Sequence, residues 1–318
     1  MFKELSTLQT WLKSGHKTAF AIVAKTWGSA PRRAGSIMVI NDKGVFEGSV
    51  SGGCVEGSVI SEAVNLITQN ETFPAFKALE FAVASEQAWE VGLACGGEIE
   101  IFLYCLSPDN IAAIEEVLSK LAARKPVSLT LPLQQGPLEV TAGTSRNGKV
   151  TPRLTDHWFE IPFVPPVRLD IVGAVHIAQH LAVMADECDF AVRVIDPRGA
   201  FSESRAFGNA TLYSDWPDEF FRDNAPDETT AIVTLTHDPK LDDAALIETL
   251  PTPAFYIGSL GSRKTHAARI ERLRELGVQE ENINRICAPV GLDIGSATPA
   301  EIAASILAEI IKAARAMT

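Results

Sequence analysis

Two glycine-rich segments in the first hundred residues each carry a thiol close to a carboxylate. The first, residues 48–57, reads GSVSGGCVEG, and the second, residues 92–98, reads GLACGGE. Segments with so few packing side chains add little to a core, so we expect them to bring backbone N–H groups and a cysteine close to a ligand. The residues expected to contact that ligand are Ser51, Gly52, Gly53, Cys54, Glu56, Cys95, Gly96 and Gly97.

A helical pattern begins directly after the first segment. Apolar residues repeat at helical spacing from Val55 through Val59 and Ala63, which predicts an amphipathic helix. An anion at the start of that helix would meet N–H groups that no helical carbonyl accepts, and the positive end of the helix dipole. We therefore expect an anionic ligand at this loop.

The cysteines of the two segments are open to several interpretations. Cys54 and Cys95 have no CxxC or CxxH companion, which argues against structural zinc. Cys54 could be a nucleophile activated by the helix N-terminus, or both thiolates could hold a thiophilic metal or cofactor. Packing in a tight loop is the remaining alternative. The other cysteines, Cys105, Cys188 and Cys287, lie in apolar contexts and are expected to be buried.

A turn in the second half of the chain occupies the place of a dinucleotide-binding fingerprint. Gly173 and His176 lie between a predicted strand and a predicted helix, and Asp196 ends the next strand, 23 positions after Gly173 (196 − 173). This spacing suits a carboxylate that binds a ribose. Val175, however, replaces the glycine that lets a pyrophosphate approach the backbone, which argues against ordinary NAD binding. Two interpretations of this turn stay open: it binds a nucleotide-like ligand, or its glycine serves only the packing of strand and helix.

Further polar residues follow predicted strands of this region, namely Arg198, His237, Ser262 and Arg263. Doubly wound sheets bind ligands at the carboxyl edge of their strands, so we expect these side chains near one site. Ser262 and Arg263 open a helix and could bind a phosphate, or form a cap beside a solvated cation. His237 could be a general acid or base, or a structural residue held by hydrogen bonds.

The order of strand and helix patterns predicts an α/β protein with more than one domain. Residues 1–125 read as an α/β domain that contains both glycine–cysteine segments, and residues 126–166 as a β-rich meander that ends in a linker. From 167 to 318 strands and helices alternate. Such alternation predicts a Rossmann-like, doubly wound parallel sheet.

Composition narrows the classes of function. The chain has 318 residues, 46% of them hydrophobic, and a formal net charge of −12. The acidic balance argues against a nucleic-acid-binding protein. No apolar run is long enough to span a membrane, and the N-terminus lacks the pattern of a secretion signal, so we expect no membrane partner. Five scattered cysteines favour a reducing cytoplasm,.

Taken together, these segments resemble the XdhC/CoxI family of molybdenum-enzyme accessory proteins, over almost the whole chain. The similarity rests on ordered matches at 48–57, 92–100, 172–176, 194–198, 236–238, 256–263, 288–295 and 298–301. Members usually carry glycine where this chain has Val175.

The resemblance implies a chaperone that binds the molybdenum cofactor, a pterin dithiolene with or without a cytosine nucleotide. It would deliver the cofactor to a xanthine-dehydrogenase-type or aldehyde-oxidising apoenzyme and assist its sulfuration with a cysteine desulfurase. Cys54 and Cys95 would then be candidate contacts of the molybdenum, and a homodimer is expected. The runner-up is an NAD(P)-dependent oxidoreductase with a degenerate fingerprint, and a third alternative is a thiol-dependent transferase that uses Cys54.

Overall fold

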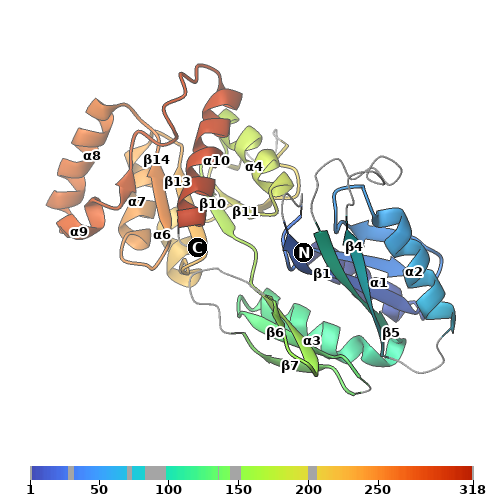
Figure 1. The fold of residues 1–318 in the computed structure, drawn as a ribbon. Helices are drawn as coiled ribbons and strands as arrows, with labels where there is room; N and C mark the ends of the chain where they lie inside the picture. The colour runs from blue at the N-terminus through green and yellow to red at the C-terminus, as the bar shows by residue number, and fades with distance from the viewer. Residues whose placement is uncertain are drawn as a thin grey trace. The chain divides into compact units, whose positions relative to one another are not determined.

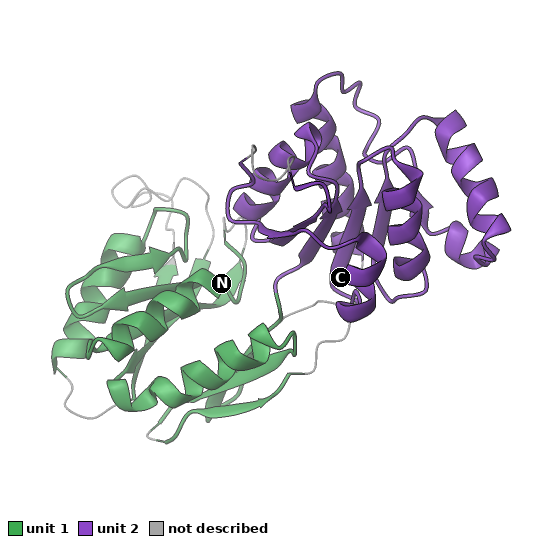
Figure 2. Ribbon diagram, turned by 180° about the vertical axis from the view of Figure 1, so that it is seen from behind, with its two compact units in different colours: residues 1–165 green, residues 166–318 purple. Residues whose placement is uncertain are grey.

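A computed structural model describes most of the chain. It covers residues 2–27, 32–69, 74–82, 98–134, 136–143, 152–199 and 206–316. The chain divides into two compact units, Met1–Pro165 and Pro166–Thr318 (Figure 2). Each unit is described by itself below.

The first unit is built on a five-stranded antiparallel sheet with helices on both faces (Figure 1). The strand order is β3 (Phe46–Gly48), β2 (Ile37–Asn41), β1 (Thr18–Trp27), β5 (Glu98–Leu106) and β4 (Ala75–Ala82). The central strand β1 alternates, because Phe20 and Ile22 face one side and Ala21 and Val23 the other,. On the first side lie α1 (Phe2–Lys13) and α3 (Ile111–Ala122), and on the second α2 (Glu56–Gln69). The short helix η1 (Pro108–Asn110) directly precedes α3.

By their contacts, residues 126–165 group with this first unit. They form a four-stranded sheet in the order β7 (Glu139–Ala142), β6 (Val127–Pro132), β9 (Trp158–Phe163) and β8 (Arg153–Leu154), so the strands are not a simple meander. Leu129 and Phe159 share a buried core with α1 and α3. The Phe159 ring meets that of Phe102 edge-on at 5.0 Å between centroids. Proline and glycine interrupt the strands, but the apolar face they bury ties them to the unit.

The second unit contains the expected parallel sheet. Its order is β12 (Thr211–Tyr213), β11 (Ala191–Ile195), β10 (Arg168–Val172), β13 (Thr230–Thr234), β14 (Tyr256–Ser259) and β15 (Ile286–Cys287). All five neighbouring pairs are parallel. The strand order reverses between β10 and β13, as in a Rossmann-like sheet. This confirms the predicted fold class.

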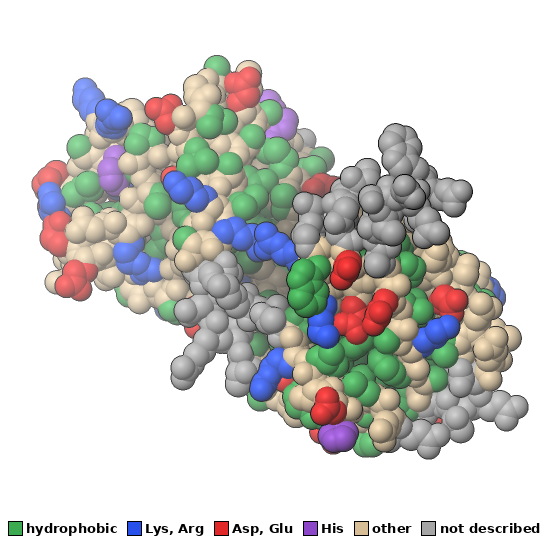
Figure 3. All heavy atoms as spheres, in the orientation of Figure 1, with side chains coloured by type: hydrophobic (Ala, Val, Ile, Leu, Met, Phe, Trp, Pro, Cys, Tyr) green, Lys and Arg blue, Asp and Glu red, His purple; other side chains and the backbone are tan. Residues whose placement is uncertain are grey.

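Helices cover both faces of the parallel sheet. One apolar cluster contains residues of α4 (His176–Glu187) and α10 (Pro299–Ala316), and the other residues of α6 (Pro217–Asp223), α7 (Pro239–Thr249), α8 (Arg263–Glu275) and α9 (Glu280–Ile283). Short elements such as β12 and α9 were not predicted. Among the described helices, none is long and apolar enough to cross a membrane. In the view of Figure 3, carboxylate side chains are scattered over the surface of each unit.

Candidate functional site

The first glycine segment folds around the carboxylate of Glu56, the first residue of α2. Its Oε1 accepts the N–H groups of Ser51 (2.9 Å) and Gly52 (3.0 Å), the N–H of Val50 at 3.3 Å, and the Ser49 hydroxyl at 2.7 Å. Its Oε2 accepts the Gly53 N–H at 2.9 Å and the Ser51 hydroxyl at 2.5 Å. The loop therefore encloses an anion that is part of the protein itself.

The electrostatics of Glu56 agree with this role. Burial alone would raise the pKa of its carboxyl, but the hydrogen bonds from the Ser51 side chain and backbone, and from Ser49, outweigh burial and lower it to about 2. The Ser51 hydroxyl in turn accepts the N–H groups of Cys54 and Val55, both at 3.0 Å. The N–H groups of the loop from Val50 to Val55 are thus accepted by side chains of the loop and of Glu56.

Cys54 sits half-buried at the end of this loop. Its predicted partner segment, with Cys95, Gly96 and Gly97, lies outside the described residues. Within the described ranges no three His, Cys, Asp or Glu side chains come together as a metal site would require. Cys105 is buried as expected, but Cys188 is exposed, because it follows the last turn of α4.

In the second unit the candidate residues follow four adjacent strands, β11, β10, β13 and β14, at their carboxyl ends. Gly173 follows β10 and has φ +108°, a conformation that suits glycine,. A Cβ there would lie 2.4 Å from Cγ2 of Thr236, which follows β13. The turn after β10 and the turn after β13 are therefore in contact, and the absence of a side chain at Gly173 permits it.

The carboxylate of Asp196 holds the turn after β10 through hydrogen bonds. One carboxylate oxygen accepts the Ala174 N–H (2.7 Å) and Nη2 of Arg198 (2.8 Å), and the other accepts the N–H and Nε of Arg198, both at 2.9 Å. Burial would raise the pKa of Asp196, but the hydrogen bonds from Arg198 and Ala174 lower it. A carboxylate has about four acceptor positions, and these four donors occupy them. The carboxylate of Asp196 therefore has no position left to accept a ribose hydroxyl, as the sequence had suggested it would.

Val175 and His176 start α4 close by. Val175 is the N-cap residue in extended conformation and packs partly in the core, while His176 is exposed. The ring of His176 lies 5.1 Å from that of His180, centroid to centroid, one helical turn further on. Sequence reasoning overlooked His180, although its i, i+4 spacing from His176 would have revealed the pair.

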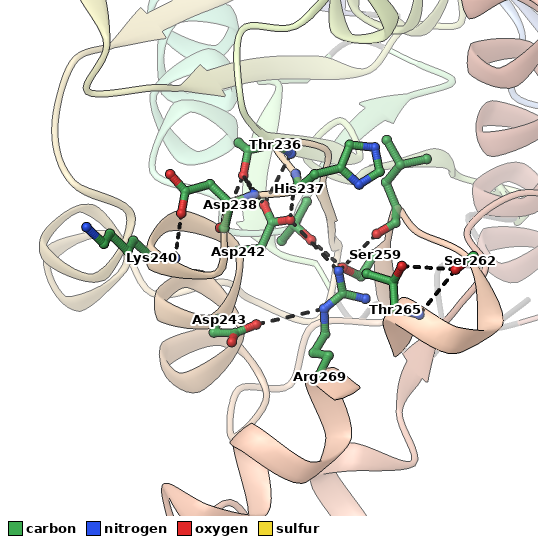
Figure 4. A network of polar contacts seen from close by, with 12 residues as sticks. Thr236, His237, Asp238, Lys240, Asp242, Asp243, Ser259, Ser262, Thr265 and Arg269 are labelled. Atoms are coloured by element: carbon green, nitrogen blue, oxygen red, sulfur yellow. Dashed lines mark hydrogen bonds and ion pairs between the residues drawn. The ribbon is translucent and has the colours of Figure 1, made fainter. Parts of the chain in front are cut away.

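The turn Thr236–Asp238 is held by a buried carboxylate of α7 (Figure 4). Asp242 accepts the hydroxyl of Thr236 at 2.7 Å and its N–H at 3.2 Å, and accepts the N–H of His237 at 3.1 Å. His237 has φ +60°, which is uncommon for a residue with a side chain,. Its side chain is exposed, so the turn presents His237 at the carboxyl edge.

Behind this turn a cluster of two buried carboxylates, the buried Arg269 and the partly exposed Arg272 joins α7 to α8. Arg269 is only 2% exposed and lies 3.9 Å from Asp242 and 3.8 Å from Asp243. Arg272 donates to Asp243 at 2.6 Å and 3.1 Å. Burial lowers the pKa of Arg269 and raises that of Asp242, while their mutual attraction opposes both shifts. No local pattern predicts this cluster, because its members come from separate helices.

Ser262 and Arg263 lie at the start of α8, as predicted. Ser262 is the N-cap residue, and its hydroxyl accepts the Thr265 N–H at 3.2 Å and lies 2.9 Å from the Thr265 hydroxyl. Arg263 is exposed in the first turn. The structure thus places Gly173, Asp196, Arg198, His237, Ser262 and Arg263 at the same sheet edge. Glu56 and Cys54 belong to the other unit.

Comparison with known proteins agrees with this architecture. The family model of the XdhC Rossmann domain matches residues 169–310, and that of the XdhC and CoxI family matches residues 11–76. The chain belongs to the XdhC/CoxI family. The domain match spans the parallel sheet from β10 to α10, and the other match ends in β4 and includes the Glu56 loop.

Individual relatives align over nearly all of this XdhC/CoxI chain. The Escherichia coli protein called molybdenum cofactor insertion chaperone PaoD is 29% identical over 94% of this chain and 84% of its own length. A Bacillus subtilis protein named as a probable xanthine dehydrogenase component is 27% identical over 96% of both chains. A solved structure titled as a xanthine dehydrogenase from Bacillus halodurans shares the fold, with a TM-score of 0.78 and 23% identity over 99% of this chain and 96% of that one.

Proposed function

We propose that this chain binds the molybdenum cofactor and inserts it into a molybdoenzyme of the xanthine dehydrogenase or aldehyde oxidoreductase type. The observation that carries the proposal is the alignment over 94% of the chain with a protein called a molybdenum cofactor insertion chaperone. The chain would act as an accessory protein without turnover of its own. Assistance in sulfuration with a cysteine desulfurase, and a homodimeric cytoplasmic protein, are part of the same proposal.

The chemistry of the cofactor suits the polar groups of the second unit. Its phosphate is an anion, and helix N-termini and arginines bind phosphates through N–H donors. Ser262 and Arg263 begin a helix, and Gly173, His176, Arg198 and His237 border the same sheet edge. Transfer to a client also requires a site from which the ligand can leave, and an open edge serves that need better than a closed cavity.

In the first unit, Cys54 is the proposed contact for the metal end of the cofactor. A thiol is a suitable ligand for a thiophilic metal, and Cys54 is half-buried rather than sealed in the core. Glu56 would act on it indirectly, because it fixes the loop through Ser51, which accepts the Cys54 N–H. Cys95, Gly96 and Gly97 stay part of the proposal as the second thiol loop.

Anaerobic transfer tests the function directly. The purified chain is mixed with isolated molybdenum cofactor, separated by size, and then added to a cofactor-free hydroxylase. We expect the cofactor to elute with the protein and to activate the apoenzyme. No co-elution, together with turnover that depends on NAD(P), would overturn the proposal in favour of an oxidoreductase. Dependence of activation on a cysteine desulfurase and its substrate cysteine tests the sulfuration step.

A matched pair of cysteine variants tests the role of Cys54. Cys54→Ala removes the thiol from the glycine loop, whereas Cys188→Ala removes an exposed thiol at the end of α4. We expect only the first to slow apoenzyme activation. Equal activation by both variants would show that Cys54 is a packing residue. Light scattering of the same samples decides whether the chain is a dimer.

A further inference from the structure

The antiparallel sheet of the first unit ends in a long edge strand, β4. It has eight residues, and among the described residues its only strand neighbour is β5. The other edge strands of the described sheets, β3, β7, β8, β12 and β15, have two to four residues. Proteins keep edges short or interrupt them with proline or bulges, because unpaired N–H and C=O groups can pair with another strand. Neither proline nor a bulge interrupts Ala75–Ala82, so a further strand can form on β4.

A groove of about 490 Å³ lies between β4 and the neighbouring helix α2 (Figure 1). Its α2 side is formed by Gly57, Ser58, Ser61 and Glu62, and its β4 side by residues 78–81. A Cβ on Gly57 would meet nothing within 4 Å. The small residues of α2 thus leave space beside the strand edge. In strand addition, the backbone edge supplies hydrogen bonds and such a groove takes alternate side chains of the added segment.

Glu80 gives an independent indication of the charge of that segment. It lies directly opposite Glu100 in the register of β4 and β5, and like charges at opposite positions destabilise a sheet. Glu100 pairs with Lys25 of β1 at 3.2 Å, whereas Glu80 forms no ion pair with a described residue. The sequence segments on either side of β4, 70–74 and 83–97, contain no lysine or arginine. A strand with Lys or Arg opposite Glu80 would supply the missing cation and extend the row of charges.

A second copy of β4 cannot supply this cation in an antiparallel pair. Leu79 packs in the core under α2 and Lys77 pairs with Glu62 of α2, so both face the helix. Side chains alternate along a strand, which places Glu80 on the other face. Opposite residues of an antiparallel pair share a face of the sheet, so Lys77 of one copy never lies opposite Glu80 of the other. The charge therefore favours a segment of a different protein.

We propose that β4 and the groove beside α2 are a docking site for an extended basic segment of the client molybdoenzyme. The segment adds a strand to β4, places Lys or Arg opposite Glu80, and places small or β-branched side chains in the groove. That the segment belongs to the client rests on the proposed function. The groove begins at Gly57, directly after Glu56 and three residues after Cys54. A client held there lies next to the loop that we assign to the cofactor.

Two synthetic peptides of roughly the length of β4 test the charge preference on the full chain. One alternates valine with lysine, and the other alternates valine with glutamate. In NMR titrations we expect only the lysine peptide to give saturable shifts of amide signals in β4 and α2. Glu80→Lys should weaken binding of the lysine peptide roughly 3- to 10-fold and gain binding of the glutamate peptide. Glu116→Lys, the same charge change on an exposed position of α3, should keep the wild-type preference.

No saturable shift with the lysine peptide, or equal binding of both peptides by the wild-type protein, would overturn the site. The same holds if Glu80→Lys keeps the wild-type preference.

Filling the groove tests its part in docking. Ser61→Phe places a ring in the groove, and Ser119→Phe adds the same ring to an exposed serine of α3, on the other face of the sheet. We expect both variants to keep the circular dichroism spectrum and the urea midpoint of the wild type. Only Ser61→Phe should lose binding of the lysine peptide, by roughly tenfold or more. Equal affinities of the two variants would contradict the groove. A wild-type dimer that Ser61→Phe dissociates would assign the groove to a second copy and overturn the proposed partner.

Activation of a cofactor-free hydroxylase separates this inference from the proposed function. We expect Ser61→Phe to retain the molybdenum cofactor as the wild type does, but to activate the apoenzyme roughly tenfold more slowly. If both proteins retain the cofactor and activate equally, the docking site is wrong and the chaperone function stands. If the wild-type protein binds the lysine peptide at β4 but retains no cofactor, the function is wrong and the site for a basic strand stands.

Discussion

At the scale of single residues, Glu56 shows how a glycine-rich loop can be organised by an internal anion. Its pKa in the folded protein is about 2, against 4.5 for an ordinary glutamate. Because the folded pKa is depressed, the charge stabilises the fold above pH 4.5, and this stabilisation is lost as the pH falls from there toward 2,. The difference between a pKa of 4.5 and one of about 2 corresponds to about 3 kcal/mol,.

Glu56→Gln should therefore lower the free energy of unfolding by about 2–3 kcal/mol at pH 7, because an amide cannot accept all the loop donors. Urea denaturation at pH 7 and at pH 3 measures the effect, and the gap between wild type and variant should shrink at the lower pH. Glu62→Gln, on the exposed face of α2 beside Lys77, is the control and should cost less than about 1 kcal/mol,. Equal costs for both variants would contradict the role of Glu56.

Gly173 is the second residue at which the effect of a substitution on stability can be predicted. Its φ of +108°, and the 2.4 Å that would separate an added Cβ from Cγ2 of Thr236, leave no room for alanine. Gly173→Ala should destabilise the second unit by about 2–4 kcal/mol, through strain and displacement of the Thr236 turn. At Gly199 a Cβ would meet nothing within 4 Å. Thermal unfolding should therefore show a large drop for Gly173→Ala and little change for Gly199→Ala.

At the scale of elements, long periodic segments were predictable and their contacts were not. The strands that became β1, β5 and β10 and the helix α1 follow from apolar runs and spacing, and α10 follows from the capping-box start at Thr298–Glu301,. The Glu56 loop was recognised by its residues, but sequence shows N–H donors without showing that a carboxylate four residues after Gly52 turns back to accept them. The Arg269 cluster was missed because Asp242 and Arg269 meet only after α7 and α8 pack.

The turn between β10 and α4 supports a prediction about nicotinamide cofactors. Restoring the fingerprint glycine with Val175→Gly removes one obstacle to dinucleotide binding. The acceptor positions of the Asp196 carboxylate, however, are still occupied by donors of Ala174 and Arg198. Neither wild type nor Val175→Gly should bind NADH or NADPH when titrated by nicotinamide fluorescence. Val175→Gly should also lose about 1 kcal/mol of stability, because glycine at this N-cap has more freedom in the unfolded chain,. Saturable NAD binding by the variant would show that Asp196 can be released.

At the scale of the whole molecule, the buried core is divided between the two units. The two apolar clusters of the first unit contain only residues up to Phe163, and the two of the second only residues from Leu169 onward. A unit with its own core can fold by itself. The boundary at Pro165–Pro166 also falls in a proline-rich stretch, where few hydrogen bonds would be lost by cutting the chain.

Residues 166–318 expressed alone should therefore fold and unfold cooperatively, with a single transition in urea followed by circular dichroism. The fragment keeps both apolar clusters of the second unit. It lacks Cys54 and the Glu56 loop, so we expect it to fail in activating a cofactor-free hydroxylase. If the fragment activates the apoenzyme as well as the full chain does, the first unit is not needed for cofactor delivery. If the fragment shows no cooperative transition, its core depends on residues 1–165.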